Sequence, residues 1–346
     1  TTMKNILRCS TKRPFADFLH ERFFSPLGMH STNLQPERAR AKGLGDRIAT
    51  GYVWDKNDQK YQGFQTPDCP EAQGAGSIIT SVNDYIRWIK ALMNHEDPIT
   101  EEVYKGIIRS RSFENPDEKH LPPFTSPRAY GAGLGTFFYR GHKIVSHSGL
   151  VAGFGSWHFF LPDVKFGGVI FGNSGDGEPV ASILGHELID ELLRVPEAER
   201  PDWNKLESGD NVNDPSEEDL RQQLCPGIKE TQPQKMPLSA YTGRYWNPGY
   251  RGITVQTKND KLFIDATDRS MGFTLTLDHI GEQTKYIAHF SDFWEGGDVP
   301  LMAEFRFDND RTVKMGLQLE EEEGFQELIW FNRVIDDQTG KQSEFR

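Results

Sequence analysis

The sequence predicts an α+β protein in two parts: an antiparallel sheet covered by helices, followed by a β-barrel of about eight strands. Three observations lead to this prediction. Strand-like runs with short turns precede an amphipathic helix, a polar stretch interrupts the chain at 196–237, and apolar and polar residues alternate beyond it. Alternation with period two is typical of half-buried strands, and such a polar stretch is typical of a linker. We therefore expect domains at 1–195 and 238–335, with a C-terminal tail at 336–346.

The composition narrows the class of protein. The chain has 346 residues, a formal net charge of -12, 36% hydrophobic residues and 26% charged residues. These values are typical of a globular protein that is longer than one hydrophobic core usually supports. The acidic balance and the lack of a basic stripe argue against a nucleic-acid partner. No apolar run approaches the roughly 20 residues that span a bilayer, so we expect no membrane partner.

The N-terminus and the cysteines indicate in which cellular compartment the protein is expected. The first twelve residues contain no apolar core and no initiator Met, so we expect no signal peptide in this stretch and a natural start further upstream. Cys9, Cys69 and Cys225 are odd in number and widely spaced, which indicates neither a disulfide framework nor a zinc site. We expect reduced thiols in a cytoplasmic protein, with no metal or other cofactor. The oligomeric state is not predicted.

Helical spacing of apolar residues predicts a helix over Pro14–Phe24, which Pro26–Met29 ends. A second helix is expected after an N-cap at Thr80 or Ser81, with Asp84 in its first turn. Short turns then separate three strands that we expect to be antiparallel neighbours, and a helix with one apolar face follows them. These elements are Lys143–Ser148, Phe154–Leu161, Phe166–Phe171 and the helix Val180–Leu193. Residues 49–70 and 94–128 are expected to be loop-rich.

The alternating pattern of the C-terminal part predicts about eight short strands. Asn259-Asp260 and Asp308-Asn309-Asp310 are typical hairpin turns between them. Regularly spaced antiparallel strands in this number predict an up-and-down barrel. The expected strands are Tyr241–Trp246, Gly252–Thr257, Lys261–Ala266, Met271–Asp278, Thr284–Phe290, Leu301–Phe307, Arg311–Leu319 and Phe325–Phe331.

The residues that point to chemistry are His147-Ser148-Gly149, followed by Leu150, on the first of the three strands. Other segments keep a fixed order around them: Pro26-Leu27-Gly28-Met29 with Ser31-Thr32, Gly74-Ala75-Gly76-Ser77 through Asp84, and Asn173 at the end of the third strand. This order resembles the serine β-lactamase and penicillin-binding-protein-like superfamily, and most closely its branch of class C β-lactamases, D-aminopeptidases and esterases. The resemblance extends from Pro14 to Leu193.

The resemblance implies a hydrolase whose serine attacks a carbonyl and forms an acyl-enzyme, with a small acyl, ester or peptide substrate. It implies that His147 lines the pocket and that Ser148 donates a hydrogen bond there. Gly149 would let the substrate backbone approach, and the backbone N–H of Leu150 would stabilise the oxyanion. The alternative for His147 is a structural histidine with satisfied hydrogen bonds. Histidine in place of the lysine of Lys-Thr-Gly favours esterase or D-aminopeptidase activity.

The superfamily's nucleophile, the serine of Ser-x-x-Lys, has no counterpart in this sequence. No serine has a lysine three residues later; Ser10 is followed by Arg13, which stays protonated and cannot act as a base. The second motif of the superfamily is Tyr-x-Asn or Ser-x-Asn. Two triplets match it, but one falls at a helix cap and the other in the barrel: Ser81-Val82-Asn83 and Tyr245-Trp246-Asn247. Ser174 does not have the Gly-x-Ser-x-Gly spacing of a nucleophilic serine, so we expect it to lie in a turn. We expect both motifs upstream and no activity in this chain alone.

The stretch Leu238–Tyr245 resembles the opening of a lipocalin-like barrel that some superfamily members carry, where the barrel narrows access to the cleft. Two alternatives to an enzyme stay open. The chain could be a non-catalytic pseudo-enzyme or small-ligand-binding protein that works through the barrel, or a fragment that does not fold stably because an edge strand is unpaired. A reading frame with Ser-x-x-Lys upstream would favour the enzyme.

Overall fold

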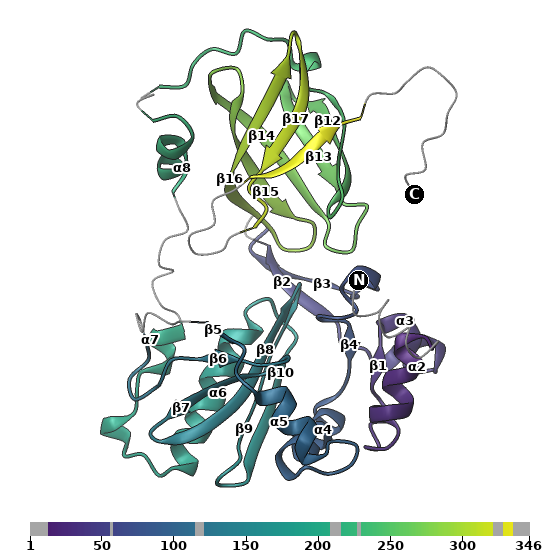
Figure 1. The fold of residues 1–346 in the computed structure, drawn as a ribbon, viewed down its shortest axis with the longest axis vertical. Coiled ribbons are helices and arrows are strands. Elements are labelled where there is room, and N and C mark those ends of the chain that lie inside the picture. Colours follow the sequence, from purple (N-terminus) through teal and green to yellow (C-terminus); the bar gives the residue numbers. More distant parts are fainter. Residues whose placement is uncertain are drawn as a thin grey trace. The chain divides into compact units, whose positions relative to one another are not determined.

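The computed structural model of the protein describes residues 13–55, 58–114, 121–207, 216–226, 230–320 and 328–334. The chain divides into two compact units, Thr1–Asn211 and Val212–Arg346 (Figure 1). The first unit contains the antiparallel sheet and its helices, and the second contains the barrel. The α+β class predicted from the sequence is therefore confirmed.

The first helix among the described residues of this unit is the one predicted from apolar spacing. It has two halves, the α-helix α2 (Phe15–Leu19) and the wider π-helix η1 (His20–Phe24). The chain then forms β1 (Asn33–Leu34), which pairs antiparallel with β4 (Ile78–Ile79). Between these two strands lie α3, two 3-10 turns and a hairpin that the sequence did not predict. Their bounds are α3 (Pro36–Ala41), η2 (Gly45–Arg47), β2 (Gly51–Asp55), β3 (Lys60–Phe64) and η3 (Pro70–Ala72).

A buried carboxylate joins two of the segments that carry the family resemblance. Asp84 lies in the first turn of α4 (Val82–Asn94), which Ser81 caps by accepting a hydrogen bond from the Asp84 backbone N–H. The Asp84 side chain is only 7% exposed. Its Oδ2 accepts hydrogen bonds from the Ser31 backbone N–H at 2.7 Å and the Thr32 hydroxyl at 2.9 Å. The loop after Pro26–Met29 is thereby fixed to the start of α4.

The central sheet has six antiparallel strands in the order β10-β9-β8-β7-β6-β5. The three predicted strands are confirmed, and β8 is longer than expected at both ends. Three further strands and the helix α5 (Glu101–Ile108) were missed, because they lie in or beside the polar stretch 94–128. The strands are β5 (Ser112–Phe113), β6 (Ala129–Tyr130), β7 (Gly135–Tyr139), β8 (His142–Val151), β9 (Phe154–Leu161) and β10 (Phe166–Gly172).

Helices cover both faces of this sheet. Ile89 and Leu92 of α4 pack with Val145 on one face, whereas Ile144 packs with residues of α6 (Gly177–Leu192) on the other. The start of α6 lies very close to the sheet, since a Cβ atom on Gly155 would lie 1.9 Å from the backbone nitrogen of Glu178. Only glycine fits at this contact. The contact fixes the start of β9 beside the part of β8 that carries the predicted site.

The polar stretch 196–237 is more structured than its composition indicates. It contains η4 (Glu197–Glu199), α7 (Trp203–Glu207) and α8 (Glu217–Leu224). Trp203 is 4% exposed and donates from Nε1 to Asp190 at 2.8 Å. Leu220 packs in a cluster with residues of the barrel strands. The two helices therefore belong to the cores of the two units, although acidic and proline residues surround them.

The second unit is a closed barrel of eight strands in sequence order, in which β11 also pairs with β18. Its interior is filled by large side chains that are at most 1% exposed, such as Tyr245, Tyr286 and Phe305. Such filling is typical of small eight-stranded barrels. The strands, preceded by η5 (Leu238–Ala240), are β11 (Gly243–Asn247), β12 (Arg251–Lys258), β13 (Lys261–Ala266), β14 (Phe273–Gly281), β15 (Lys285–Asp292), β16 (Gly296–Asp308), β17 (Arg311–Leu317) and β18 (Ile329–Arg333).

We predict that Asp84→Ala lowers the free energy of unfolding of the first unit by about 2–4 kcal/mol, because it leaves two buried donors without their charged acceptor. Urea denaturation measures the change. Asp58→Ala is the control, since Asp58 is exposed and pairs with the exposed Lys60, and it should cost less than about 1 kcal/mol. Equal losses for the two variants would contradict the role of Asp84.

Candidate active site

The imidazole of His147 is held between a tyrosine and its own strand. Nδ1 contacts the carbonyl oxygen of Ser148, and Nε2 lies 2.9 Å from the Tyr130 hydroxyl. A carbonyl oxygen only accepts, so the proton of a neutral His147 is on Nδ1 and the Tyr130 hydroxyl donates to Nε2. The ring therefore presents its basic nitrogen to Tyr130, at the end of the short strand β6. This contact was not predicted, because no motif links the two residues.

The end of strand β8 beyond His147 has one open edge. On one side β8 pairs with β9 as far as Val151, but on the other side its pairing with β7 ends at Ser146. No other strand of the described residues pairs with that side. In an antiparallel strand the N–H groups point alternately to the two edges. The segment from His147 to Val151 thus offers backbone hydrogen-bonding groups to a ligand lying alongside it.

Neither Ser148 nor Gly149 brings a side chain to the face of the sheet that carries His147. Ser148 lies opposite Trp157, and successive side chains of a strand point to opposite faces, so the Ser148 side chain leaves β8 on the other face from His147. A Cβ on Gly149 would lie 2.6 Å from the Ser156 hydroxyl oxygen of the next strand. A rotation of the Ser156 side chain would relieve this contact, so the packing of β8 against β9 does not by itself require the glycine. The Leu150 side chain is 62% exposed, as expected beside an open edge.

His158 is a site residue that the sequence reasoning missed. It lies directly opposite His147 in the pairing of β8 with β9, and the two rings are nearly parallel with centroids 6.3 Å apart. The short turn between Val151 and Phe154 could have revealed this pairing, because counting back from it places residue 147 opposite residue 158. The side chain is 8% exposed, and Nδ1 lies 3.4 Å from the Tyr85 hydroxyl. Among the described residues, Nε2 has no partner.

Burial sets the protonation states of His158 and Tyr85. Desolvation lowers the pKa of His158 to about 3, and the electrostatic effects of His147 and Arg128 act in the same direction. Burial also raises the pKa of Tyr85 to about 12. His158 is therefore neutral and Tyr85 protonated over the whole ordinary pH range. The site thus combines the more accessible pair Tyr130–His147 with the buried neutral pair Tyr85–His158.

In the part of the chain that the structure describes, no group of three or more His, Cys, Asp or Glu residues could hold a metal ion. Cys69 and Cys225 are free thiols, and Cys9 lies outside the described residues. No helix of the described residues is long and apolar enough to cross a membrane.

Two protein-family models match the chain. The model described as Beta-lactamase matches residues 2–191, which include the whole candidate site, and a model described as a domain of unknown function (DUF3471) matches residues 228–333.

Similar proteins include two hydrolases. The chain is 30% identical over 337 residues to the unguisins hydrolase ungD' of Aspergillus campestris, covering 96% of this chain and 61% of that protein. It is 24% identical over 225 residues to the D-aminopeptidase of Cereibacter sphaeroides, covering 60% of this chain and 38% of that one. A solved structure of the octameric penicillin-binding protein homologue from Pyrococcus abyssi is 18% identical, with a TM-score of 0.48, covering 95% and 62%. The chain spans less than two thirds of the length of these proteins.

We predict that the free energy of unfolding falls as the pH falls below about 6.5. The pKa of His186, buried between Trp157 and Trp203, is lowered to about 4, as that of His158 is to about 3. The unfolded histidines bind protons from about pH 6.5 downward and the folded ones do not. Each therefore costs up to about 1.4 kcal/mol of stability per pH unit.

Urea denaturation between pH 7.5 and 5.5 checks this dependence. His186→Phe should reduce the slope of stability against pH, whereas His30→Ala, at an exposed position, should reduce it less. An unchanged slope in His186→Phe would show that His186 is not buried as a neutral ring.

Proposed function

Since the chain belongs to the Beta-lactamase family, we propose that it forms part of a serine hydrolase that cleaves small amide or ester substrates through an acyl-enzyme. The observation that carries this proposal is the open edge of β8 from His147 to Val151, beside an imidazole with a basic nitrogen facing a tyrosine. A backbone edge recognises extended peptide-like substrates by main-chain hydrogen bonds. The hydrolases named among the similar proteins support an amide or peptide substrate.

His147 and Tyr130 are the proposed proton carriers. In the neutral tautomer, Nε2 of His147 accepts the tyrosine hydroxyl proton, so a proton can pass between the two atoms as charge develops on a substrate. Ser148 fixes this tautomer through its carbonyl oxygen, which accepts from Nδ1. His147 thereby has a positioned hydrogen bond on each nitrogen, as a general acid or base requires. The neutral His158 behind it adds no competing positive charge.

The backbone N–H of Leu150 is the proposed oxyanion donor. It lies in the segment of β8 that β7 does not cover, so a tetrahedral intermediate could approach it from the open edge. Fixed backbone donors are effective here because they require no reorganisation during the reaction. The contact between Gly155, the partner of Leu150 on β9, and the start of α6 holds this part of the strand in place.

We propose that the nucleophile lies outside these 346 residues. No serine in the sequence is followed three residues later by lysine, and the chain covers 61% of the unguisins hydrolase that it resembles. Neither serine of β8 replaces it, because Ser146 is fully buried and Ser148 leaves β8 on the face opposite His147. Catalysis then needs a segment that supplies Ser-x-x-Lys beside the open edge.

A binding role for the barrel is the alternative, and the structure gives it less support. Large aromatic side chains fill the barrel interior, including Tyr241, Tyr245 and Phe331, each fully buried. A barrel that holds a ligand needs space between such side chains. The candidate site in the first unit therefore carries the proposed function.

We predict that the 346-residue chain forms no covalent adduct with a fluorophosphonate probe, because it lacks the activated serine. A form of the protein extended upstream to include Ser-x-x-Lys should gain one adduct by intact mass. Labelling of the short chain would identify a serine within it as the nucleophile and refute the proposed location.

In the extended form we predict that His147→Ala lowers kcat at least about a hundredfold, because it removes a positioned acid–base group. Tyr130→Phe should lower kcat in the same direction. His142→Ala is the matched control on the same strand, since His142 pairs with Asp163 at the far end, and it should retain most activity. Unchanged turnover in His147→Ala would remove His147 from the site.

A further inference from the structure

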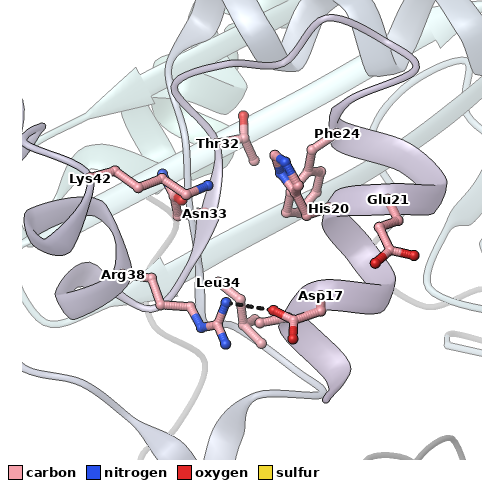
Figure 2. A pocket seen from close by; sticks show the side chains of 10 residues that line it. Asp17, His20, Glu21, Phe24, Thr32, Asn33, Leu34, Arg38 and Lys42 are labelled. Carbon is pink, nitrogen blue, oxygen red and sulfur yellow. Dashed lines mark hydrogen bonds and ion pairs between the residues drawn. The ribbon is translucent and has the colours of Figure 1, made fainter. Parts of the chain in front are cut away.

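A cavity of about 190 Å³ lies between the α2–η1 helix and the segment of β1 and α3. All of its lining residues fall between Ala16 and Lys42, so it is separate from the site on β8 (Figure 2). Ala16, Phe24 and Leu34 form an apolar wall and are buried. The cavity is large enough for several water molecules or one small organic acid.

Asn33 is one of the residues that line this cavity, and it has an unused donor. Its side chain is only 3% exposed, yet Nδ2 has no hydrogen-bond partner among the described residues. Leaving a buried polar group unpaired costs roughly 1–3 kcal/mol, so such groups are rare and need an explanation. A ligand that accepts a hydrogen bond from Asn33 would remove this cost.

The charged groups around the cavity separate into paired and unpaired ones. Arg38 donates to Asp17 at 2.9 Å, and Glu21 pairs with Arg13. Lys42 has no ion pair among the described residues, and neither does the imidazole of His20. In Figure 2 the side chains of Lys42 and His20 point toward the same space, Asn33 lies beside Lys42, and Glu21 points away. The groups left to bind a ligand are thus a cation and two further polar groups, of which Asn33 offers N–H donors.

We propose that this cavity binds a small monocarboxylate with an apolar body. The carboxylate would accept hydrogen bonds from Asn33 and Lys42, and its hydrocarbon part would contact Phe24 and Leu34. One free ammonium balances a single negative charge. A phosphate dianion would carry more charge than Lys42 neutralises and would lie near the carboxylate of Asp17. This site is independent of the acyl-transfer proposal.

Benzoate tests the proposal in the 346-residue chain. The side-chain amide signal of Asn33 is assigned in a nitrogen–proton NMR spectrum by its loss in Asn33→Leu. We expect this signal to shift saturably with benzoate. Benzamide has the same shape without the charge, so it should bind at least about tenfold more weakly. Inorganic phosphate should also bind more weakly than benzoate.

Two lysine variants supply the matched comparison. Lys42→Met should weaken benzoate binding about tenfold, whereas Lys105→Met, which removes an exposed lysine paired with Glu101, should leave it unchanged. Lys42 is exposed, so this test holds even if Asn33→Leu fails to fold. Absence of a saturable shift, equal binding of benzamide, tighter binding of phosphate, or no effect of Lys42→Met would each overturn the proposal.

Discussion

The pairing of β8 with β9 is the constraint on which the candidate site depends. Its register places His147 opposite His158 and Leu150 opposite Gly155. Because side chains alternate between the faces of a strand, a shift of one residue would turn His147 to the opposite face and remove it from Tyr130. The buried aromatic side chains of β9 hold the register from both faces of the sheet. The chemistry at the edge of the sheet thus depends on hydrophobic packing at its centre.

The two histidines of the candidate site lie on one face of the sheet but differ in how deeply they are buried. His147 is partly exposed and has a hydrogen bond on each nitrogen, whereas His158 is buried and satisfied on one nitrogen only. Burial disfavours the charged imidazole, so the inner ring stays neutral. Two histidines separated by one strand spacing are therefore suited to different tasks.

Strong periodic patterns allowed the strands β8 to β10, the helix α6 and the barrel to be predicted. The motif His147-Ser148-Gly149 was also visible, because its residues are consecutive in the sequence. Tyr130 and His158 were not found as partners of His147, since only strand pairing brings them together. The helix with Trp203 was missed because one buried aromatic residue holds it, in a stretch whose composition is that of a linker. The two-residue strands β5 and β6 have no periodicity to recognise.

The close approach of α6 to the sheet at Gly155 limits how this protein can diverge. Side chains along the open edge of β8 can be exchanged without moving the backbone, so the substrate preference of the proposed site can change by substitution alone. The spacing between the helix and the strand cannot follow, because any side chain at residue 155 would meet backbone atoms of α6 that have nowhere to move. Variation in the site is therefore confined to the side chains along β8, while the spacing between β9 and α6 is fixed.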